Sequence, residues 1–123
     1  MAVRGVRGAT VAEKSDPENI LSATRILLNA ILAENPDMIL EDIASVLFTS
    51  ADDLNSVYPA KAAREMGWNQ VPLMCAREIP VPGGLVGCIR VLIHWNTDKP
   101  QSEIRHVYLG AAASLRPDLS GKS

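Results

Sequence analysis

Two arginines of this sequence stand inside segments that read as strands, and both are suited to bind an anion. Arg90 lies in the apolar run CIRVLIHW, and Arg7 lies in the run VRGVRGATV. An unpaired buried arginine would cost several kcal/mol, so Arg90 needs water at a sheet edge, an ion pair within the fold, or an anionic ligand. The small neighbours of Arg7, which are Gly5, Gly8 and Ala9, would let a ligand approach the backbone closely. An exposed strand arginine explains Arg7 equally well.

Three further side chains of the expected strands could take part in such a site. Glu78 ends a strand just before a Pro/Gly loop, and Cys75 precedes it by three residues. These two positions face opposite sides of a regular strand, so a shared site requires a bend or bulge. No neighbouring base in the sequence would activate the Cys75 thiol. The alternative to a role in the site is that Cys75 simply packs in the apolar core. We expect Tyr108 to be half-buried, with its ring packed against neighbours and its hydroxyl in contact with water. Residue types and spacing alone predict only that the protein binds a small polyanion.

The remaining ionisable groups give no metal or cofactor signature. Lys61 and Arg64 are three residues apart, so they share one face of an expected short helix, ordinarily a solvated basic face. His94 and His106 have no second ligand placed beside them, and the two cysteines form neither a C-x-x-C pair nor a metal-ligand spacing. We therefore interpret both histidines as structural and expect no metal and no cofactor.

The bulk composition predicts a single soluble domain covering residues 1–123. The chain is 47% hydrophobic and 21% charged, with a formal net charge of −2, which argues against nucleic acid as a partner. No apolar run approaches the roughly 18 residues that span a bilayer, and the first ten residues lack the apolar stretch of a signal peptide. Two cysteines without a framework spacing favour a reduced, cytoplasmic protein over one with a disulfide.

The elements that would position these side chains form an α+β domain: a mixed sheet of about five strands packed by one long and one short helix. Ser15 or Asp16 caps the long helix, Pro17 lies in its first turn, and Glu18 completes a capping box. The expected strands are 2–11, 43–50, 71–78, 88–95 and 104–109, and the helices begin at Pro17 and Pro59 and end before Asn35-Pro36 and Gly67, with a short helical turn at 37–42. Several strands are apolar on both faces in places, which predicts that helices cover one face and a partner subunit the other.

Four separated segments, in this order and at this spacing, resemble the chorismate mutases of the small α/β (AroH) class. The segments are VRGVRGATVAE, YPAKAAREMGW, VPLMCAREIPVPGGLVGCIRV and IRHVYLGAAASLRPDL, and the resemblance covers nearly all of residues 1–119. It implies the bacillus-type chorismate mutase fold, a homotrimer that forms a pseudo-α/β-barrel, and three active sites at the subunit clefts. It also implies a cofactor-free [3,3] rearrangement of chorismate to prephenate in phenylalanine and tyrosine biosynthesis.

The resemblance further implies a role for each matching residue. Arg90 would contact the ether oxygen of the breaking bond and a carboxylate, Arg7 and Tyr108 would hold the carboxylate of the enolpyruvyl group, and Glu78 with the Cys75 backbone or thiol would hold the ring hydroxyl. The neighbouring side of the cleft would supply Tyr58, Lys61, Arg64, Met74 and Leu115, with Arg116 and a flexible tail at 117–123 closing the mouth. Tyr58 stands where the family has phenylalanine, and Met74 where it has a smaller polar residue, so both bear on substrate fit.

Two other functions fit a small trimer that binds a carboxylate at a subunit cleft. One is a trimeric imine deaminase, and the other is a non-catalytic sensor of small dicarboxylates. The set of Arg7, Cys75, Glu78, Arg90 and Tyr108 resembles the mutase rather than the deaminase. A sensor would need the cations but not the hydroxyl-binding acid Glu78. The rearrangement itself needs no nucleophile, metal or proton transfer, so we expect no catalytic histidine or serine.

Overall fold

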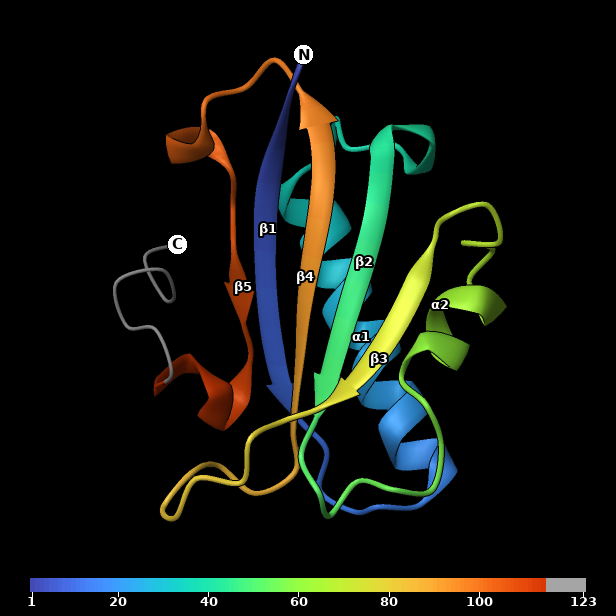
Figure 1. The fold of residues 1–123 in the computed structure, drawn as a ribbon, viewed down its shortest axis with the longest axis vertical. Helices are drawn as coiled ribbons and strands as arrows, with labels where there is room; N and C mark the ends of the chain where they lie inside the picture. Colours follow the sequence, from blue (N-terminus) through green and yellow to red (C-terminus); the bar gives the residue numbers. More distant parts are fainter. Residues whose placement is uncertain (115–123) are drawn as a thin grey trace.

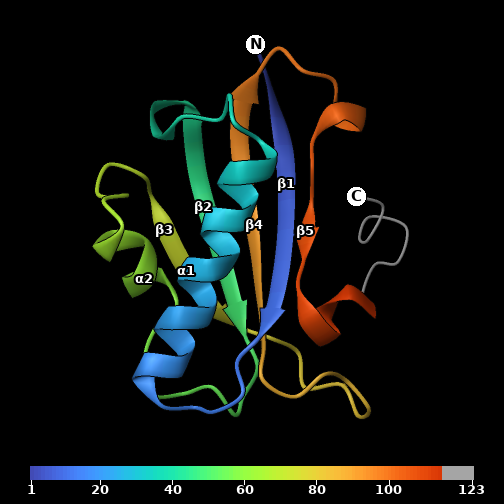
Figure 2. The ribbon, with the colours of Figure 1, turned by 180° about the vertical axis from the view of Figure 1, so that it is seen from behind.

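A computed structural model describes residues 1–114, which form a five-stranded mixed sheet with one long helix lying across one face (Figures 1 and 2). The predicted α+β class is confirmed. The strands are β1 (Ala2–Val11), β2 (Ile43–Ser50), β3 (Leu73–Arg77), β4 (Cys88–Thr97) and β5 (Val107–Tyr108), and the α-helices are α1 (Pro17–Glu34) and α2 (Ala60–Glu65). Short 3-10 turns lie at Leu40–Asp42, Gln101–Glu103 and Gly110–Ser114. The predicted flexible tail at 117–123 lies outside the described residues.

The sheet has the strand order β3-β2-β4-β1-β5, with β4 at its centre. β4 runs antiparallel to both β1 and β2, and the outer strands β3 and β5 run parallel to their neighbours. Each predicted strand is present, but β3 and β5 are shorter than predicted and β4 continues two residues further. The longest strands therefore lie in the middle of the sheet, where both neighbours supply hydrogen bonds.

Alternate residues of β4 face two different environments. Val91, Ile93 and Trp95 are buried in the main core beneath α1, which crosses the sheet in Figure 2. Arg90, Leu92 and His94 point to the other face, where each remains partly exposed. Figure 1 views the molecule from this second face, which we call the uncovered face because α1 lies behind the sheet. The period of two along the strand thus separates core residues from candidate site residues.

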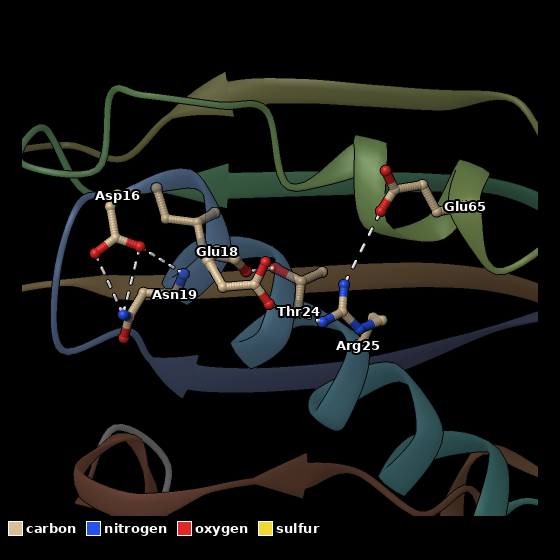
Figure 3. A network of polar contacts seen from close by, with 7 residues as sticks. Asp16, Glu18, Asn19, Thr24, Arg25 and Glu65 are labelled. Atoms are coloured by element: carbon tan, nitrogen blue, oxygen red, sulfur yellow. Dashed lines mark hydrogen bonds and ion pairs between the residues drawn. The ribbon is translucent and has the colours of Figure 1, made fainter.

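The start of α1 is fixed by Asp16, whose carboxylate accepts a hydrogen bond from the backbone N–H of Asn19 at 2.9 Å (Figure 3). Pro17 occupies the first turn as predicted, and Asp16 rather than Ser15 is the N-cap. The predicted capping box is wrong, because capping at Asp16 places Glu18 second in the helix, where it cannot reach back to the cap.

Glu18 instead belongs to a chain of charges that links the two helices. Its carboxylate lies 3.5 Å from the guanidinium of Arg25, and the same guanidinium lies 3.9 Å from Glu65 at the end of α2 (Figure 3). All three side chains are substantially exposed, so these contacts help to orient α2 beside α1 but contribute little to the stability of the fold.

Gly8 serves the packing of α1 rather than a ligand. A Cβ atom at this position would lie 2.7 Å from Cδ1 of Ile31 and 3.2 Å from Cδ1 of Leu27. The expectation that Gly8 lets a ligand approach the backbone is therefore wrong, since this residue faces the helix. Gly5 and Ala9 lie on the uncovered face with Arg7, as the alternation predicts.

The outer edge of β1 is completed by side chains before β5 begins. The Gln101 amide accepts a hydrogen bond from the Gly5 N–H at 3.0 Å and donates one to the Gly5 carbonyl at 2.6 Å. Nδ1 of His106 accepts the Arg7 N–H at 2.9 Å. Only then do Val107 and Tyr108 pair with β1 as a regular strand. These contacts explain why the predicted fifth strand at 104–109 is only two residues long, and they give His106 the structural role expected of it.

None of the helices within residues 1–114 is both long enough and apolar enough to cross a membrane.

Candidate active site

One row of residues across the uncovered face carries the central candidates. Arg90 is in register with Ala9 of β1 on one side and with Thr49 of β2 on the other. Tyr108 pairs with Ala9, and Ala76 of β3 pairs with Thr49, which extends the row over all five strands. Of this row, Arg90 and Thr49 remain accessible from the uncovered face, whereas Ala9 is buried under Tyr108 and Ala112.

A hollow of about 400 Å³ opens beside Thr49 and Arg90 and reaches the next row at Arg7, Leu92 and Leu47, and we call it the arginine hollow. It brings together three of the predicted site residues from β1, β4 and the chain just after β3. Its lining residues are Arg7, Leu47, Thr49, Glu78, Arg90, Val91 and Leu92. A second depression of about 340 Å³ shares Glu78 and Arg90 and reaches towards the loop at 79–86. The pair of Arg90 and Glu78 therefore stands between two adjoining spaces.

Arg90 and Glu78 form an ion pair in which Nε lies 3.3 Å from Oε2. Thr49 donates a hydrogen bond from Oγ1 to the same Oε2 atom at 2.6 Å. The Arg90 side chain remains 37% exposed, while its buried Nε makes no hydrogen bond with any residue in 1–114. The sequence analysis left open whether Arg90 forms an ion pair within the fold or binds an anionic ligand. The geometry accommodates both, because Glu78 contacts only one edge of the guanidinium.

Neither cysteine is an activated nucleophile. Burial raises the pKa of the Cys75 thiol, although the Ala60 N–H and the charge of Arg64 oppose the shift. Burial also raises the pKa of the Cys88 thiol, against the opposing effect of nearby Arg90. Both thiols are free and are therefore protonated at neutral pH.

The hydroxyl of Tyr108 is buried, whereas the sequence predicted that it would contact water. Tyr108 is only 8% exposed and packs against Ala9 and Ala112. Its hydroxyl is buried and has no hydrogen-bond partner in the part of the chain that the structure describes, so the expectation of a hydroxyl in water is wrong. A buried hydroxyl without a partner is costly unless something supplies one, which makes it a candidate group for ligand binding.

Cys75 and Tyr58 line a separate depression of about 570 Å³, which we call the cysteine hollow. Cys75 is in register with the buried Phe48 and packs against the main core, so its thiol faces away from Glu78. The hollow lies between residues 50–59 and 75–77. Arg77 forms two hydrogen bonds with Asp52 at its rim, and this contact lowers the pKa of the Asp52 carboxyl. The positive charge of Arg77 is therefore already paired with Asp52.

The other predicted contact residues lie in the cysteine hollow, on α2 or on the uncovered face. Tyr58 is 70% exposed and Met74 is 66% exposed, and Met74 pairs with Leu47 on the uncovered face. Lys61 and Arg64 are exposed on α2, and Arg64 is close enough to Cys75 to influence its thiol. None of these four lines the arginine hollow. The structure thus brings Arg7, Glu78 and Arg90 together in the arginine hollow and separates the remaining predicted residues from it.

Comparison with known proteins decides the family. Residues 3–119 match the model of the family described as chorismate mutase type I. This chain belongs to the chorismate mutase type I family. It is 54% identical to the chorismate mutase AroH of Thermus thermophilus, over 95% of this chain and 96% of that protein. It is 49% identical to the chorismate mutase AroH of Bacillus subtilis (strain 168), over 98% of this chain and 94% of that protein.

The fold agrees with the sequence relationship. A solved chorismate mutase from Clostridium thermocellum superposes with a TM-score of 0.86 at 44% identity, covering 89% of this chain and 97% of that one. The predicted resemblance and the predicted activity are confirmed: the chain is a chorismate mutase, an enzyme of aromatic amino acid biosynthesis that isomerises chorismate to prephenate. This relationship favours the mutase over the deaminase and the sensor.

Sequence reasoning missed one residue of this chorismate mutase that lines the arginine hollow. Thr49 ends the apolar run IASVLFT and carries no charge, so nothing in its own segment marks it. Only the pairing of β2 with β4 places its hydroxyl beside Arg90. Leu115 and Arg116, which the resemblance assigns to the cleft, lie outside the described residues.

Proposed function

We propose that this chorismate mutase works by selecting the reactive conformer of its substrate and by stabilising the charge of the breaking C–O bond. The observation that carries this proposal is the grouping of Arg7, Glu78 and Arg90 around one hollow. An intramolecular rearrangement requires a shaped and charged site rather than a nucleophile. Within residues 1–114, no three or more His, Cys, Asp and Glu side chains are grouped in a way that could hold a metal ion.

Each charged group of the arginine hollow has a task in this proposal. Arg90 lies at the centre of the row and contacts the ether oxygen, on which negative charge develops as the bond breaks. Arg7 and the partnerless hydroxyl of Tyr108 hold the carboxylate of the enolpyruvyl group. Glu78 accepts a hydrogen bond from the ring hydroxyl. Two cations suit a substrate that carries two carboxylates.

Electrostatics gives Arg90 the largest share of the rate. A cation about 4 Å from a developing negative oxygen supplies on the order of 4 kcal/mol at an effective dielectric constant of 20. That amount corresponds to about three powers of ten in rate. Arg90 is 37% exposed in the single chain, where water would screen much of this effect. The full effect therefore requires a second surface that closes over the arginine hollow.

We propose that a second subunit provides this surface within a homotrimer. The uncovered face carries Leu47 and Leu92 together with the exposed Val3 and Met74, which favours burial against another chain. Tyr58, Lys61, Arg64 and Cys75 lie away from the arginine hollow, so they would reach the substrate of a neighbouring subunit. The cysteine hollow of one chain would then face the arginine hollow of the next. We further propose that the enzyme acts in the cytoplasm, which its two free cysteines support.

Mixing two inactive variants tests the shared site. Arg90→Met removes the cation of the arginine hollow, and Arg64→Met removes the cation beside the cysteine hollow. If one active site takes Arg90 from one subunit and Arg64 from the next, refolding the two variants together in equal amounts restores intact sites. Random assembly makes about a quarter of the clefts intact, which is one half times one half. The readout is the loss of chorismate absorbance.

The control is the same mixture of the two variants without unfolding, which should stay inactive while the trimers remain assembled. Light scattering on the wild-type protein measures the mass of the assembly. Recovery near a quarter of the wild-type rate, in an assembly of three chains, supports the shared site. No recovery from a correctly refolded trimer would place the whole site on one subunit and contradict the proposal.

A further inference from the structure

The backbone of Glu78 is held by the sheet, whereas its side chain is held by two neighbours through a single oxygen atom. Its N–H donates a hydrogen bond to the Ser50 carbonyl at 2.9 Å, which continues the pairing of β3 with β2 for one residue beyond the strand. The carboxylate makes its two contacts, with Thr49 and Arg90, through the same oxygen, Oε2. Among the residues in 1–114, no hydrogen bond to Oε1 is found, so this oxygen is available to a ligand.

The contact with Thr49 is the shorter of the two and has the better geometry. Oγ1 of Thr49 lies 2.6 Å from Oε2, whereas Nε of Arg90 lies 3.3 Å from it and makes an ion pair without a hydrogen bond. A hydrogen bond to a charged carboxylate is stronger than one between neutral groups. Removal of the Thr49 hydroxyl would therefore leave only the ion pair to orient Glu78.

The place of Thr49 in the sheet makes it a rigid anchor. It lies on β2 in register with Arg90 on one side and with Ala76 on the other. Ala76 and Glu78 are two residues apart and face the same side, so the small side chain of Ala76 leaves the path from Thr49 to Glu78 open. A β-branched residue in a strand has few rotamers, which keeps the hydroxyl where the carboxylate needs it.

We propose that Thr49 is a positioning residue of the mutase site. Its hydroxyl holds Oε2 of Glu78 against Arg90, which turns Oε1 towards the arginine hollow to accept the ring hydroxyl of the substrate. This inference rests on the proposed role of Glu78 and extends it. Thr49 acts through Glu78 and makes no contact with the reacting atoms.

A double-mutant cycle separates positioning from a general structural role. Thr49→Val removes the hydroxyl at nearly constant shape, and we expect it to lower kcat/KM about 10-fold, the size of one hydrogen bond to a charged group. Thr49→Ser retains the hydroxyl and should recover most of the rate. In a Glu78→Ala background no carboxylate remains to be oriented, so Thr49→Val should then cost less than about two-fold.

Thr97→Val is the matched control, because it removes one threonine hydroxyl, which accepts the Lys99 N–H, from the strand next to β2. Thr97 lies seven residues along β4 from Arg90, roughly 23 Å away, and should leave kcat/KM unchanged. Should Thr49→Val fail to fold, Thr49→Ala against Thr49→Ser makes the same comparison. Thermal unfolding of each variant shows which of them are folded.

The outcomes distinguish this inference from the proposed function on which it rests. If Glu78→Ala is impaired but Thr49→Val is not, the role of Thr49 is wrong and the role of Glu78 stands. An equal loss from Thr49→Val in both backgrounds would show that Thr49 supports the sheet rather than the carboxylate. A normal rate for Glu78→Ala would overturn both assignments together.

Discussion

Along β4, Val91, Ile93 and Trp95 lie buried beneath α1, whereas Arg90, Leu92 and His94 on the opposite face remain partly exposed. The first face is completed within the single chain, since α1 supplies the apolar surface that the strands need. The second face carries charges and apolar side chains together. Within residues 1–114, Tyr108 and Ala112 cover it at Ala9, whereas Arg90, Leu92 and His94 stay partly exposed. In the proposed mechanism, one side of this strand supports stability and the other supports the reaction, so substitutions on its two sides should have separable effects.

The largest expected effect is a loss of stability from the helix-covered face. Phe48 is fully buried and pairs with Val91. Phe48→Ala should lower the free energy of unfolding by about 3–5 kcal/mol, because it removes a large apolar side chain and leaves a cavity. Urea denaturation measures this loss, and the rate per folded molecule should change little. If Phe48→Ala instead had normal stability and a strongly reduced rate, the assignment of stability to the helix-covered face would be wrong.

The uncovered face should show the opposite behaviour. Arg90→Met should lower kcat by at least the 10²–10³-fold seen when a single oxyanion donor is removed, because it deletes the cation at the breaking bond. Stability should stay within about 1 kcal/mol, since the ion pair with Glu78 is partly exposed. Glu78→Gln should lower kcat less than Arg90→Met does, because it weakens orientation but keeps the cation. Steady-state kinetics and urea denaturation provide both readouts, and the reverse order would count against the assigned roles.

The smallest effect concerns the two cysteines, one on each side of the sheet. Burial raises the pKa of both thiols, so at pH 8 each holds less of the reactive thiolate than an ordinary cysteine does. We expect iodoacetamide to modify the partly exposed Cys75 slowly and the buried Cys88 more slowly still. Mass spectrometry follows both reactions, and unfolding in guanidinium should make their rates similar. Rapid modification of Cys75 at pH 7 would indicate an activated thiol and contradict its assignment.

The sequence was sufficient for features set by local pattern. The apolar run at residues 88–95 predicted the strand that contains Arg90, and Pro17 marked the first turn of α1. The resemblance of four segments to one family identified that family. The site residues that it implies stay predictions, of which Arg7, Glu78 and Arg90 lie around one hollow. Each of these signals lies within a few consecutive residues or within motifs that keep their spacing.

Features that depend on pairing between distant segments could not be read in this way. Thr49 becomes part of the site only through its register with Arg90, forty-one residues later in the chain. Gly8 is small because Ile31 packs against it, and the fifth strand is short because Gln101 and His106 occupy the edge of β1 with their side chains. Such contacts follow from the three-dimensional arrangement, which no single segment encodes.

The side chains along the edge of β1 also limit how this protein can associate. Gln101 and His106 occupy backbone groups that would otherwise be able to pair with a strand of another molecule. At the opposite edge β3 is only five residues long, and α2 lies beside it (Figure 1). Continuous growth of the sheet from chain to chain is therefore blocked at one border and poorly supported at the other. These two edges agree with the proposed homotrimer, in which chains associate through the face of the sheet and symmetry closes the assembly instead of extending it into a fibre.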